Sequence, residues 1–165
     1  MKAMVNADFR VRPMIPSDAG RLEEIVDISF SWFVRSFALH SLREERQVLV
    51  SETLGEAVGF VKLVDVQVGS GKFGCILWVA VHPQFRGRGI ATTLVNAGFE
   101  RLKHSGAKAV FAPVRRRNTA SLTVFGRQGF RKMGFLELWR LFGWRIFEFY
   151  SNIWLAPWVV VLMHD

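Results

Sequence analysis

The amino-acid sequence predicts an α+β fold with a mixed β-sheet. Runs with the two-residue period of strands alternate with patterns of helical period, in the order β-α(α)-β-β-β-α-β-α-β, followed by an apolar segment and a last strand. The chain has 165 residues, half of them apolar, and contains no repeat, low-complexity tract or obvious linker. We therefore expect one domain over residues 1–165.

The N-terminal half predicts a strand, a long helical segment and a hairpin. The alternating run Phe9–Met14 indicates the first strand. The helix that follows, with Ser17 as its N-cap, is expected to continue to about His40. The hairpin consists of two strands, Gln47–Glu52 and Ala57–Val68. Gly55 in the turn between them is expected to have a positive φ.

The second half alternates strands and helices. After a flexible loop, "GSGKFG", the near-continuous apolar run Cys75–Val81 is typical of a strand that is covered on both faces. A glycine- and arginine-rich turn, His82–Ala91, leads into a helix over Thr92–Gly106. The remaining predicted elements are a strand at Lys108–Val114, a helix at Asn118–Gln128 with Asn118 as N-cap, a strand within residues 129–136 and a last strand at Trp158–Met163.

Composition limits the expected partners. Lys and Arg outnumber Asp and Glu by 22 to 14, so the formal net charge is +8, which favours an acidic partner such as nucleic acid, an anionic membrane or a phosphorylated cofactor. The basic residues are scattered apart from Arg115–Arg117, and zinc-finger and RRM motifs are absent from the sequence, so nucleic acid is not the expected partner. Cys75 is the only cysteine, and the four histidines lack ligand spacing, so we expect no metal site.

The sequence carries no recognisable targeting or membrane-spanning signal. Its first residues lack the apolar core of a signal peptide. The longest uncharged stretch, Phe149–Met163, contains Pro157 and is too short to span a bilayer. We therefore expect a cytoplasmic protein.

The turn before the Thr92–Gly106 helix has the features of an anion-binding site. A helix N-terminus carries unpaired amides and a partial positive charge. Gly87 and Gly89 have no side chains to block a close approach, and Arg86 and Arg88 add positive charge. Together they describe a cradle for a pyrophosphate. The simpler interpretation of this motif alone is a tight strand–helix turn that contains two glycines.

Two common nucleotide motifs fit the sequence less well. "GSGKFG" resembles part of a Walker A motif, but Phe73 follows Lys72 where Ser or Thr is needed, and Val66 replaces the first glycine. A Rossmann fingerprint needs Gly or Ala where Thr92 stands, and an acidic residue is missing near position 112. A nicotinamide-dependent enzyme is therefore the weaker alternative.

Two segments resemble the signatures of the GNAT superfamily of acyl-CoA-dependent N-acyltransferases. The first signature (Gln or Arg, two residues, Gly, one residue, Gly or Ala) is matched by Gln84–Gly89 and continued by Ile90 and Ala91. The second is matched at Asn118, Ser121, Gly129 and Phe130, with Phe125 in place of its tyrosine. The resemblance covers Phe9 to about Phe135 and the last strand. It implies a mostly antiparallel central sheet, splayed at the cofactor site and flanked by helices.

The resemblance also implies a function: transfer of an acetyl group from acetyl-CoA to a primary amine by direct attack in a ternary complex. The amides of Arg86–Ala91 would hold the pyrophosphate, the strand at Val79 and Val81 would pair with the pantetheine arm, and Asn118 would contact that arm or act only as a helix cap. Arg115–Arg117 form a solvated loop or contact the 3′-phosphate. The cofactor-binding residues implied are Val79, Val81, Gln84, Arg86, Gly87, Arg88, Gly89, Ile90, Ala91, Asn118 and Phe125.

Catalytic residues are not defined by the sequence. Phe125 occupies the position of the family's usual tyrosine acid and has no proton to give. The Cys75–Val81 strand carries no carboxylate, so the candidate bases are Asp65 and Glu52 on neighbouring strands, each of which is better explained as a surface or capping group. The alternative function is a non-catalytic, acyl-CoA-binding regulatory module. The acceptor is left open among protein N-termini, lysines, polyamines, amino acids and drugs.

The aromatic segment Leu136–Trp158 predicts an additional amphipathic helix. Its apolar face at helical period consists of Trp139, Phe142, Ile146, Phe149, Tyr150, Ile153 and Trp154. The opposite face is almost neutral, which argues against an anionic membrane as partner. The apolar face packs on its own domain, walls an apolar substrate or forms a dimer contact; we expect a homodimer centred on Ile146.

Overall fold

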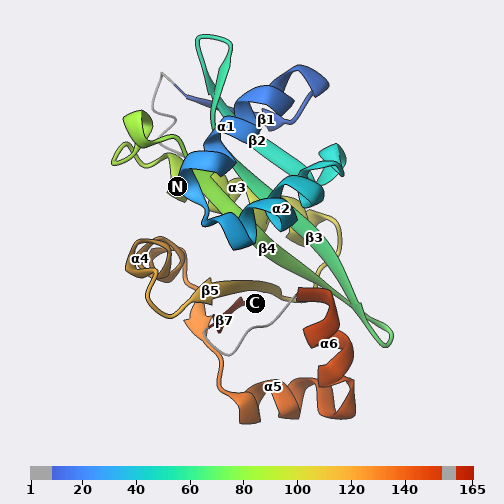
Figure 1. The fold of residues 1–165 in the computed structure, drawn as a ribbon. Helices are drawn as coiled ribbons and strands as arrows, with labels where there is room; N and C mark the ends of the chain where they lie inside the picture. The colour runs from blue at the N-terminus through green and yellow to red at the C-terminus, as the bar shows by residue number, and fades with distance from the viewer. Residues whose placement is uncertain (1–8, 154–158) are drawn as a thin grey trace. The chain divides into compact units, whose positions relative to one another are not determined.

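The computed structural model describes residues 9–153 and 159–165 (Figure 1). Within these ranges, seven strands follow the order β1-β2-β3-β4-β5-β7-β6. Strands β4 and β5 pair in parallel, whereas the pairs β1–β2, β2–β3, β5–β7 and β6–β7 are antiparallel. The predicted α+β class with a mixed, mostly antiparallel sheet is therefore confirmed.

The chain divides into two compact units. The N-terminal unit contains residues 9–62 and 78–97, and the C-terminal unit contains residues 63–77, 98–153 and 159–165. The long strands β3 (Glu56–Val68) and β4 (Gly71–Val81) contribute residues to both units. Each unit is described by itself below.

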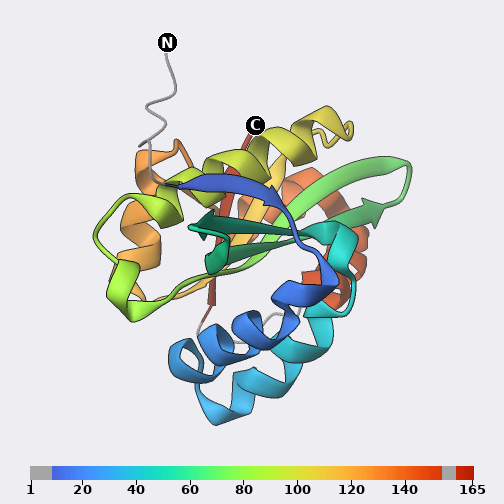
Figure 2. The same ribbon diagram turned by 90° about the horizontal axis from the view of Figure 1, so that it is seen from above.

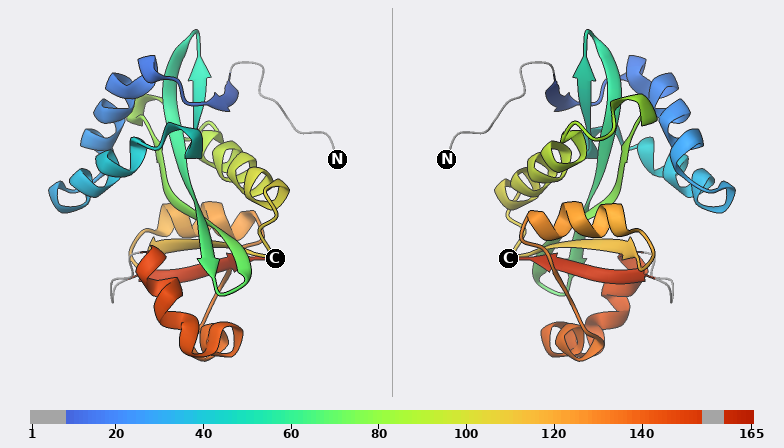
Figure 3. Two further views of the ribbon diagram at one scale, coloured as in Figure 1. Left: turned by 90° about the vertical axis from the view of Figure 1, so that its right-hand side faces the viewer. Right: turned by 90° about the vertical axis from the view of Figure 1, so that its left-hand side faces the viewer.

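In the N-terminal unit, helices cover both faces of the strands. Strands β1 (Arg10–Pro13) and β2 (Val48–Thr53) lie beside the start of β3. Helices α1 (Ala19–Ser29) and α2 (Trp32–Leu42) pack on one face, and the first part of α3 (Ile90–His104) packs on the other (Figures 2 and 3). Three 3-10 turns complete the unit: η1 (Pro16–Asp18), η2 (Glu45–Gln47) and η3 (Pro83–Phe85). The apolar core on the α1–α2 side includes Leu22, Ile25, Val26, Ala38, Val48, Val50 and Phe60.

Close packing of α3 on the sheet depends on Gly59 in β3. A Cβ atom at this position would lie 2.9 Å from the carbonyl oxygen of Ala80 and 3.3 Å from Leu94 Cδ1. Neither a strand carbonyl nor a buried leucine can move away at low cost, so only glycine fits here. Gly59 therefore allows α3 to lie close to the sheet at Leu94.

The helical region of the N-terminal unit differs from the sequence prediction in two ways. The single helix expected to reach His40 is interrupted, because Phe30 (φ −114°, ψ 147°) and Ser31 (φ −66°, ψ 153°) are extended. Ser17 is not an N-cap. Asp18 instead caps the turn, since its Oδ2 accepts a hydrogen bond from the Ile15 amide at 2.9 Å.

In the C-terminal unit, β5 (Val110–Arg115) pairs with β7 (Val159–His164), and β6 (Arg131–Lys132) extends the sheet beyond β7. Helix α4 (Thr119–Arg127) lies on one face of the β5–β7 pair; α5 (Phe135–Phe142), the turn η4 (Gly143–Arg145) and α6 (Ile146–Ile153) lie on the other (Figure 3). The parallel register of β4 with β5 covers two residue pairs, Gly74↔Val110 and Cys75↔Phe111.

Several strands and loops have other boundaries in the structure than the sequence predicted. The "GSGKFG" loop shrinks to a turn, because β4 already begins at Gly71. The strand predicted within residues 129–136 contains only Arg131 and Lys132. Trp158, predicted as the first residue of the last strand, lies outside the described residues, and β7 is described from Val159.

The single amphipathic helix predicted for Leu136–Trp158 is wrong over its described part. Two eight-residue helices, α5 and α6, are separated by a turn at Gly143, whose φ is +54°. Residues 154–158, which include Trp154 and Pro157, lie outside the described residues. Four residues of the predicted apolar face are buried within the unit: Phe142, Ile146, Phe149 and Ile153. They pack with Leu138 and with β5 and β7, whereas Trp139 and Tyr150 are partly buried against this core. Ile146 is completely buried, so it is not the centre of a dimer contact.

An ion-pair cluster connects β1 and the turn η1 to β2. Asp18, only 6% exposed, accepts hydrogen bonds from Arg12 Nη1 at 2.7 Å and Nη2 at 2.9 Å, and Arg12 also pairs with Glu52. The hydrogen bonds from Arg12, and that from the Ile15 amide, hold the pKa of Asp18 below its ordinary value. A lowered acid pKa stabilises the fold above the pKa of the unfolded chain, about 3.9, and this contribution is lost as the pH falls through the folded-state pKa.

Asp18→Asn is expected to lower the free energy of unfolding at pH 7 by about 2 kcal/mol, because charged hydrogen bonds to Arg12 are lost. The difference from wild type should shrink below about pH 4, where Asp18 itself becomes protonated. Urea denaturation at pH 7 and at pH 3 measures both effects. The control is Asp27→Asn, which breaks an exposed pair with Arg35 and should cost much less stability than Asp18→Asn does. Equal losses in the two variants would contradict the role of Asp18.

Candidate functional site

The predicted anion cradle lies between β4 and α3 in the N-terminal unit. The 3-10 turn η3 is followed by Gly87 (φ +77°) and Gly89 (φ +80°), and α3 begins at Ile90. Both glycines adopt the left-handed conformation that other residues disfavour. A Cβ atom on either glycine would meet no heavy atom within 4 Å, so the space beside the turn is open.

Backbone amides accumulate in this turn without partners. Among the described residues, none of the six consecutive amides of residues 87–92 donates a hydrogen bond. The amides just before them are used: Phe85 N–H donates to the His82 carbonyl at 2.9 Å, and Arg86 N–H donates to the Pro83 carbonyl at 3.3 Å. Six unpaired donors at the positive end of α3 form a site suited to an extended anion such as a pyrophosphate.

The two arginines of the turn hold its shape. Arg86 Nε donates to the Val81 carbonyl at 2.9 Å, and its Nη2 donates to Ser29 Oγ at 3.3 Å. Arg88 Nη2 donates to the Gln84 carbonyl at 3.4 Å, and the guanidinium lies 5.4 Å from the centre of the Phe85 ring. Their contacts therefore tie the turn to β4, to α1 and to itself, while their charge raises the local positive potential.

His82 also has a structural role. It is 8% exposed, its ring packs edge-on against Phe85, and its Nδ1 accepts the Gln84 amide at 3.4 Å. That hydrogen bond places the ring proton on Nε2, which lies 3.9 Å from Glu24 Oε1. His82 therefore caps η3.

The C-terminal part of β4 carries the residues predicted to pair with pantetheine. Val79 is half-buried and Val81 is buried, and both lie beyond Cys75, where the described pairing of β4 with β5 ends. Pairing of this stretch with a cofactor stays a prediction.

Sequence reasoning missed the neighbouring residue, Trp78. Its indole Nε1–H is buried without a hydrogen-bond partner among the described residues, and its ring packs edge-on against Phe30 at 5.4 Å. The available signal was a single indole within the otherwise aliphatic run "CILWVAV".

The second signature lies in the C-terminal unit, at α4. Asn118 Oδ1 accepts the Ser121 amide at 3.1 Å, so Asn118 is the predicted N-cap. Phe125 is 4% exposed and packs edge-on against Phe130 at 5.0 Å. Gly129 has a φ of +86° and ends the helical region before Phe130. Joint binding of one ligand by this region and the Gln84–Ala91 turn stays a prediction.

The two candidate bases are held in ion pairs. Asp65 lies 3.4 Å from Lys72 Nζ and accepts a hydrogen bond from Ser105 Oγ at 3.4 Å. Glu52 pairs with Arg12, as described above. Both are explained by these surface and structural contacts, and a role as base stays a prediction for each.

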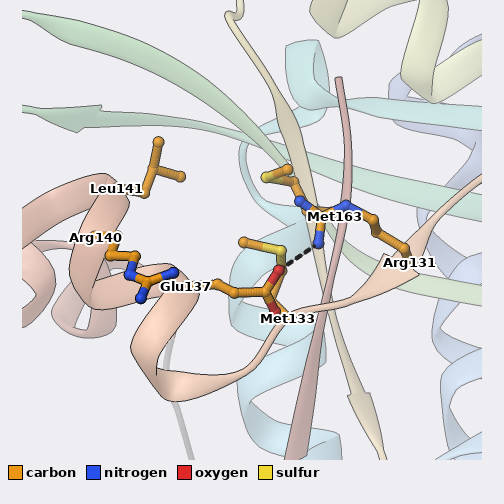
Figure 4. Close-up of a pocket in the computed structure, with 6 residues that line it drawn as sticks. All are labelled: Arg131, Met133, Glu137, Arg140, Leu141 and Met163. Atoms are coloured by element: carbon orange, nitrogen blue, oxygen red, sulfur yellow. Dashed lines mark hydrogen bonds and ion pairs between the residues drawn. The ribbon is translucent and has the colours of Figure 1, made fainter.

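An open pocket of about 300 Å³ in the C-terminal unit was not predicted (Figure 4). It is lined by Arg131, Met133, Glu137, Arg140, Leu141 and Met163. Arg131 Nη1 donates to Glu137 Oε1 at 2.7 Å, and the Gly134 amide donates to the other carboxylate oxygen at 2.8 Å. The Gly134 amide and Arg131 lower the pKa of Glu137, so this carboxylate stays ionised. The pocket therefore combines charged groups with an apolar wall.

Three further features bear on function. Within residues 9–153 and 159–165, His, Cys, Asp and Glu side chains form no group of three or more that could hold a metal ion. In the same ranges, no helix has both the length and the apolar character needed to cross a membrane. Cys75 is fully buried in the C-terminal core, and burial raises the pKa of its thiol.

A sequence profile described as the acetyltransferase (GNAT) family matches residues 14–130 of the chain. An uncharacterized N-acetyltransferase of Methanocaldococcus jannaschii is 29% identical over 113 residues, which cover 67% of this chain and 47% of the relative. The chain thus spans about half the length of that relative.

Solved structures show the same fold. A GNAT family N-acetyltransferase, YhbS from Escherichia coli in complex with CoA, has a TM-score of 0.63 and 26% identity, covering 75% of this chain and 69% of its own. Ard1 from Thermoplasma volcanium has a TM-score of 0.68 and 19% identity, and the match covers 95% of this chain and 97% of Ard1. A chain of the NatC complex bound to Gag peptide and CoA has a TM-score of 0.71 and 15% identity, and the match covers 94% of this chain and 97% of the NatC chain.

Proposed function

The chain belongs to the acetyltransferase (GNAT) family, and we propose that it is an N-acetyltransferase that moves an acetyl group from acetyl-CoA to a primary amine. The observation that carries this proposal is the row of six unpaired amides at residues 87–92. The complexes of the Escherichia coli relative and of NatC with CoA support the choice of cosubstrate. We propose that residues 1–165 act as one N-acetyltransferase domain in the cytoplasm.

In this proposal the amides of residues 87–92 hold the pyrophosphate of acetyl-CoA, and the open space beside Gly87 and Gly89 admits it. The main chain at Val79 and Val81 binds the pantetheine arm by strand addition. Asn118 adds a contact near the thioester, and its side chain keeps its role as the cap of α4. Acetyl-CoA supplies an activated thioester, which the acceptor amine attacks directly while both are bound.

The chain's own acid–base contribution is small in this proposal. Phe125 has no proton to donate, so the thiol group leaves without help from this position. A thiol pKa of about 8.5 makes such a departure feasible near neutral pH. Orientation of two bound reactants then supplies most of the rate enhancement.

Phe125 also favours the second candidate function, a non-catalytic acyl-CoA-binding module, because it cannot act as an acid. An acetyl-CoA turnover screen, read by mass spectrometry, separates the two. It should include a peptide N-terminus, a lysine side chain, a polyamine, free amino acids and an amine drug. Acetylation of one class supports the enzyme. Binding of CoA without acetylation of any class supports the regulatory module.

Gly89→Glu is expected to weaken CoA binding tenfold or more, because a carboxylate in the cradle repels the pyrophosphate and blocks its hydrogen bonds. Calorimetric titration with CoA measures the loss. The matched control is Gly106→Glu, since Gly106 also has a positive φ (+92°) and open space around it but lies at the end of α3. Equal CoA affinity in wild type and Gly89→Glu would place the cofactor elsewhere.

Phe125→Tyr is expected to raise turnover by up to about a hundredfold, provided that protonation of the leaving group limits the rate. The control is Phe130→Tyr, which adds a hydroxyl to the buried ring that packs against Phe125. Steady-state kinetics on the acetylated class measures both variants. If Phe125→Tyr folds but gains nothing over the control, an acid at this position is not what the reaction lacks.

A further inference from the structure

The α5–η4–α6 region exposes large apolar side chains on its outer side. The aromatic patch consists of Phe135, Leu136, Trp139, Trp144 and Phe147. Phe135 is 59% exposed, Leu136 69%, Trp144 78% and Phe147 65%. The ring of Trp139 lies 6.1 Å from that of Phe135 and 5.1 Å from that of Trp144, so three of the rings form a continuous row.

Most of the aromatic patch is separate from the residues that hold the unit together. The same helices bury a different stripe, which includes Leu138, Phe142, Ile146 and Phe149, against β5 and β7. Trp139 is partly buried against this core, whereas Phe135, Leu136, Trp144 and Phe147 are left exposed. Clustered exposed rings of this kind mark an interaction surface.

Among the described charged side chains beside the aromatic patch, the acidic ones have hydrogen-bond partners and Arg140 has none. Glu137 is held by the Gly134 amide and by Arg131, and Glu148 accepts the Gly69 amide at 3.2 Å. Arg140, in contrast, makes no hydrogen bond or ion pair within the described part of the chain, and its charge contributes to the lowered pKa of Glu137. The expectation of a neutral polar face assumed one continuous helix, whereas the structure divides these charges between α5 and α6, where Glu148 also pairs with Arg145 at 4.0 Å.

The whole C-terminal unit is basic. Its described residues include twelve Lys and Arg against five Asp and Glu, whereas the complete chain has 22 against 14. The excess of positive charge is thus concentrated in the unit that carries the aromatic patch.

We propose that the aromatic patch binds the surface of an anionic lipid bilayer. Trp, Phe and Leu side chains enter the headgroup region, and nearby arginines contact lipid phosphates, as in interfacial amphipathic helices. The pocket of Figure 4 combines similar chemistry, because Arg140 stands beside Met133, Leu141 and Met163, while Arg131 is paired with Glu137. A phospholipid likewise places an anionic group beside hydrocarbon.

A second copy of the chain fits this surface less well. Two basic units would face each other, and their like charges repel. The four most exposed side chains present on the order of 500 Å², given 150–250 Å² for a large side chain. A stable dimer buries about 800 Å² on each partner.

Co-sedimentation with lipid vesicles tests the proposal. The full chain is expected to bind vesicles of phosphatidylcholine with one quarter phosphatidylglycerol more tightly than vesicles of phosphatidylcholine alone. The double variant Trp144→Ala/Phe147→Ala should lose affinity roughly tenfold. Arg140→Gln should lose about fivefold on anionic vesicles only. The control is Trp32→Ala, which removes an 84% exposed tryptophan from α2 and should bind as wild type does.

Three results would overturn the proposal. The first is no binding of wild type to anionic vesicles. The second is an equal loss in Trp32→Ala and in the double variant, with circular dichroism showing both folded. The third is a lipid-free dimer in sedimentation velocity that the double variant dissociates, which would assign the surface to a second copy. Acetyl transfer is not needed for any of these readings, so they are independent of the proposed enzyme activity.

Discussion

The proposed site depends on backbone amides that the fold leaves unpaired. An amide without a partner is tolerated only where water or a ligand can reach it, and Gly87, Arg88 and Gly89 are exposed. Their arrangement is fixed by the surrounding structure: Gly87 and Gly89 in left-handed conformations, Arg86 bonded to β4 and α1, and His82 capping the preceding turn. Gly59 allows α3 to lie close to the sheet at Leu94. Anion binding is thus prepared by main-chain geometry, and side chains mostly support it.

Local signals in the sequence predicted the parts of the fold that local interactions determine. Gly55 has the expected positive φ, Asn118 caps α4, and β3 follows its apolar run almost to the residue. The break at Phe30–Ser31 was not predicted, because neither residue is a helix breaker; in the structure Phe30 is the C-cap of α1 and Ser31 the N-cap of α2. In the Leu136–Trp158 segment a signal was present: Gly143 marks the division between α5 and α6, but helical periodicity runs through it.

The sequence identified the segment that forms the candidate site, but it did not identify the partners of the side chains there. Spacing located the Gln84–Ala91 turn, because the turn is contiguous in the chain. The bonds from Arg86 to Ser29 and from Arg12 to Glu52 join residues 57 and 40 positions apart, and no local pattern encodes them. The same limit applies to Asp65, whose partners Lys72 and Ser105 explain its position. Trp78 shows the reverse case, since the residue type is evident in the sequence but its buried, unpaired indole nitrogen is evident only in the structure.

Burial of Cys75 has a practical consequence for chemical labelling. The chain contains a single thiol, which lies fully inside the C-terminal core and resists ionisation. Maleimides and other thiol reagents attack the accessible thiolate, so the folded native chain offers them no target. A cysteine introduced at an exposed position, such as that of Leu54 in the β2–β3 turn, would be the only thiol that these reagents reach. The native sequence therefore serves directly as a background-free scaffold for fluorophores, spin labels or surface attachment.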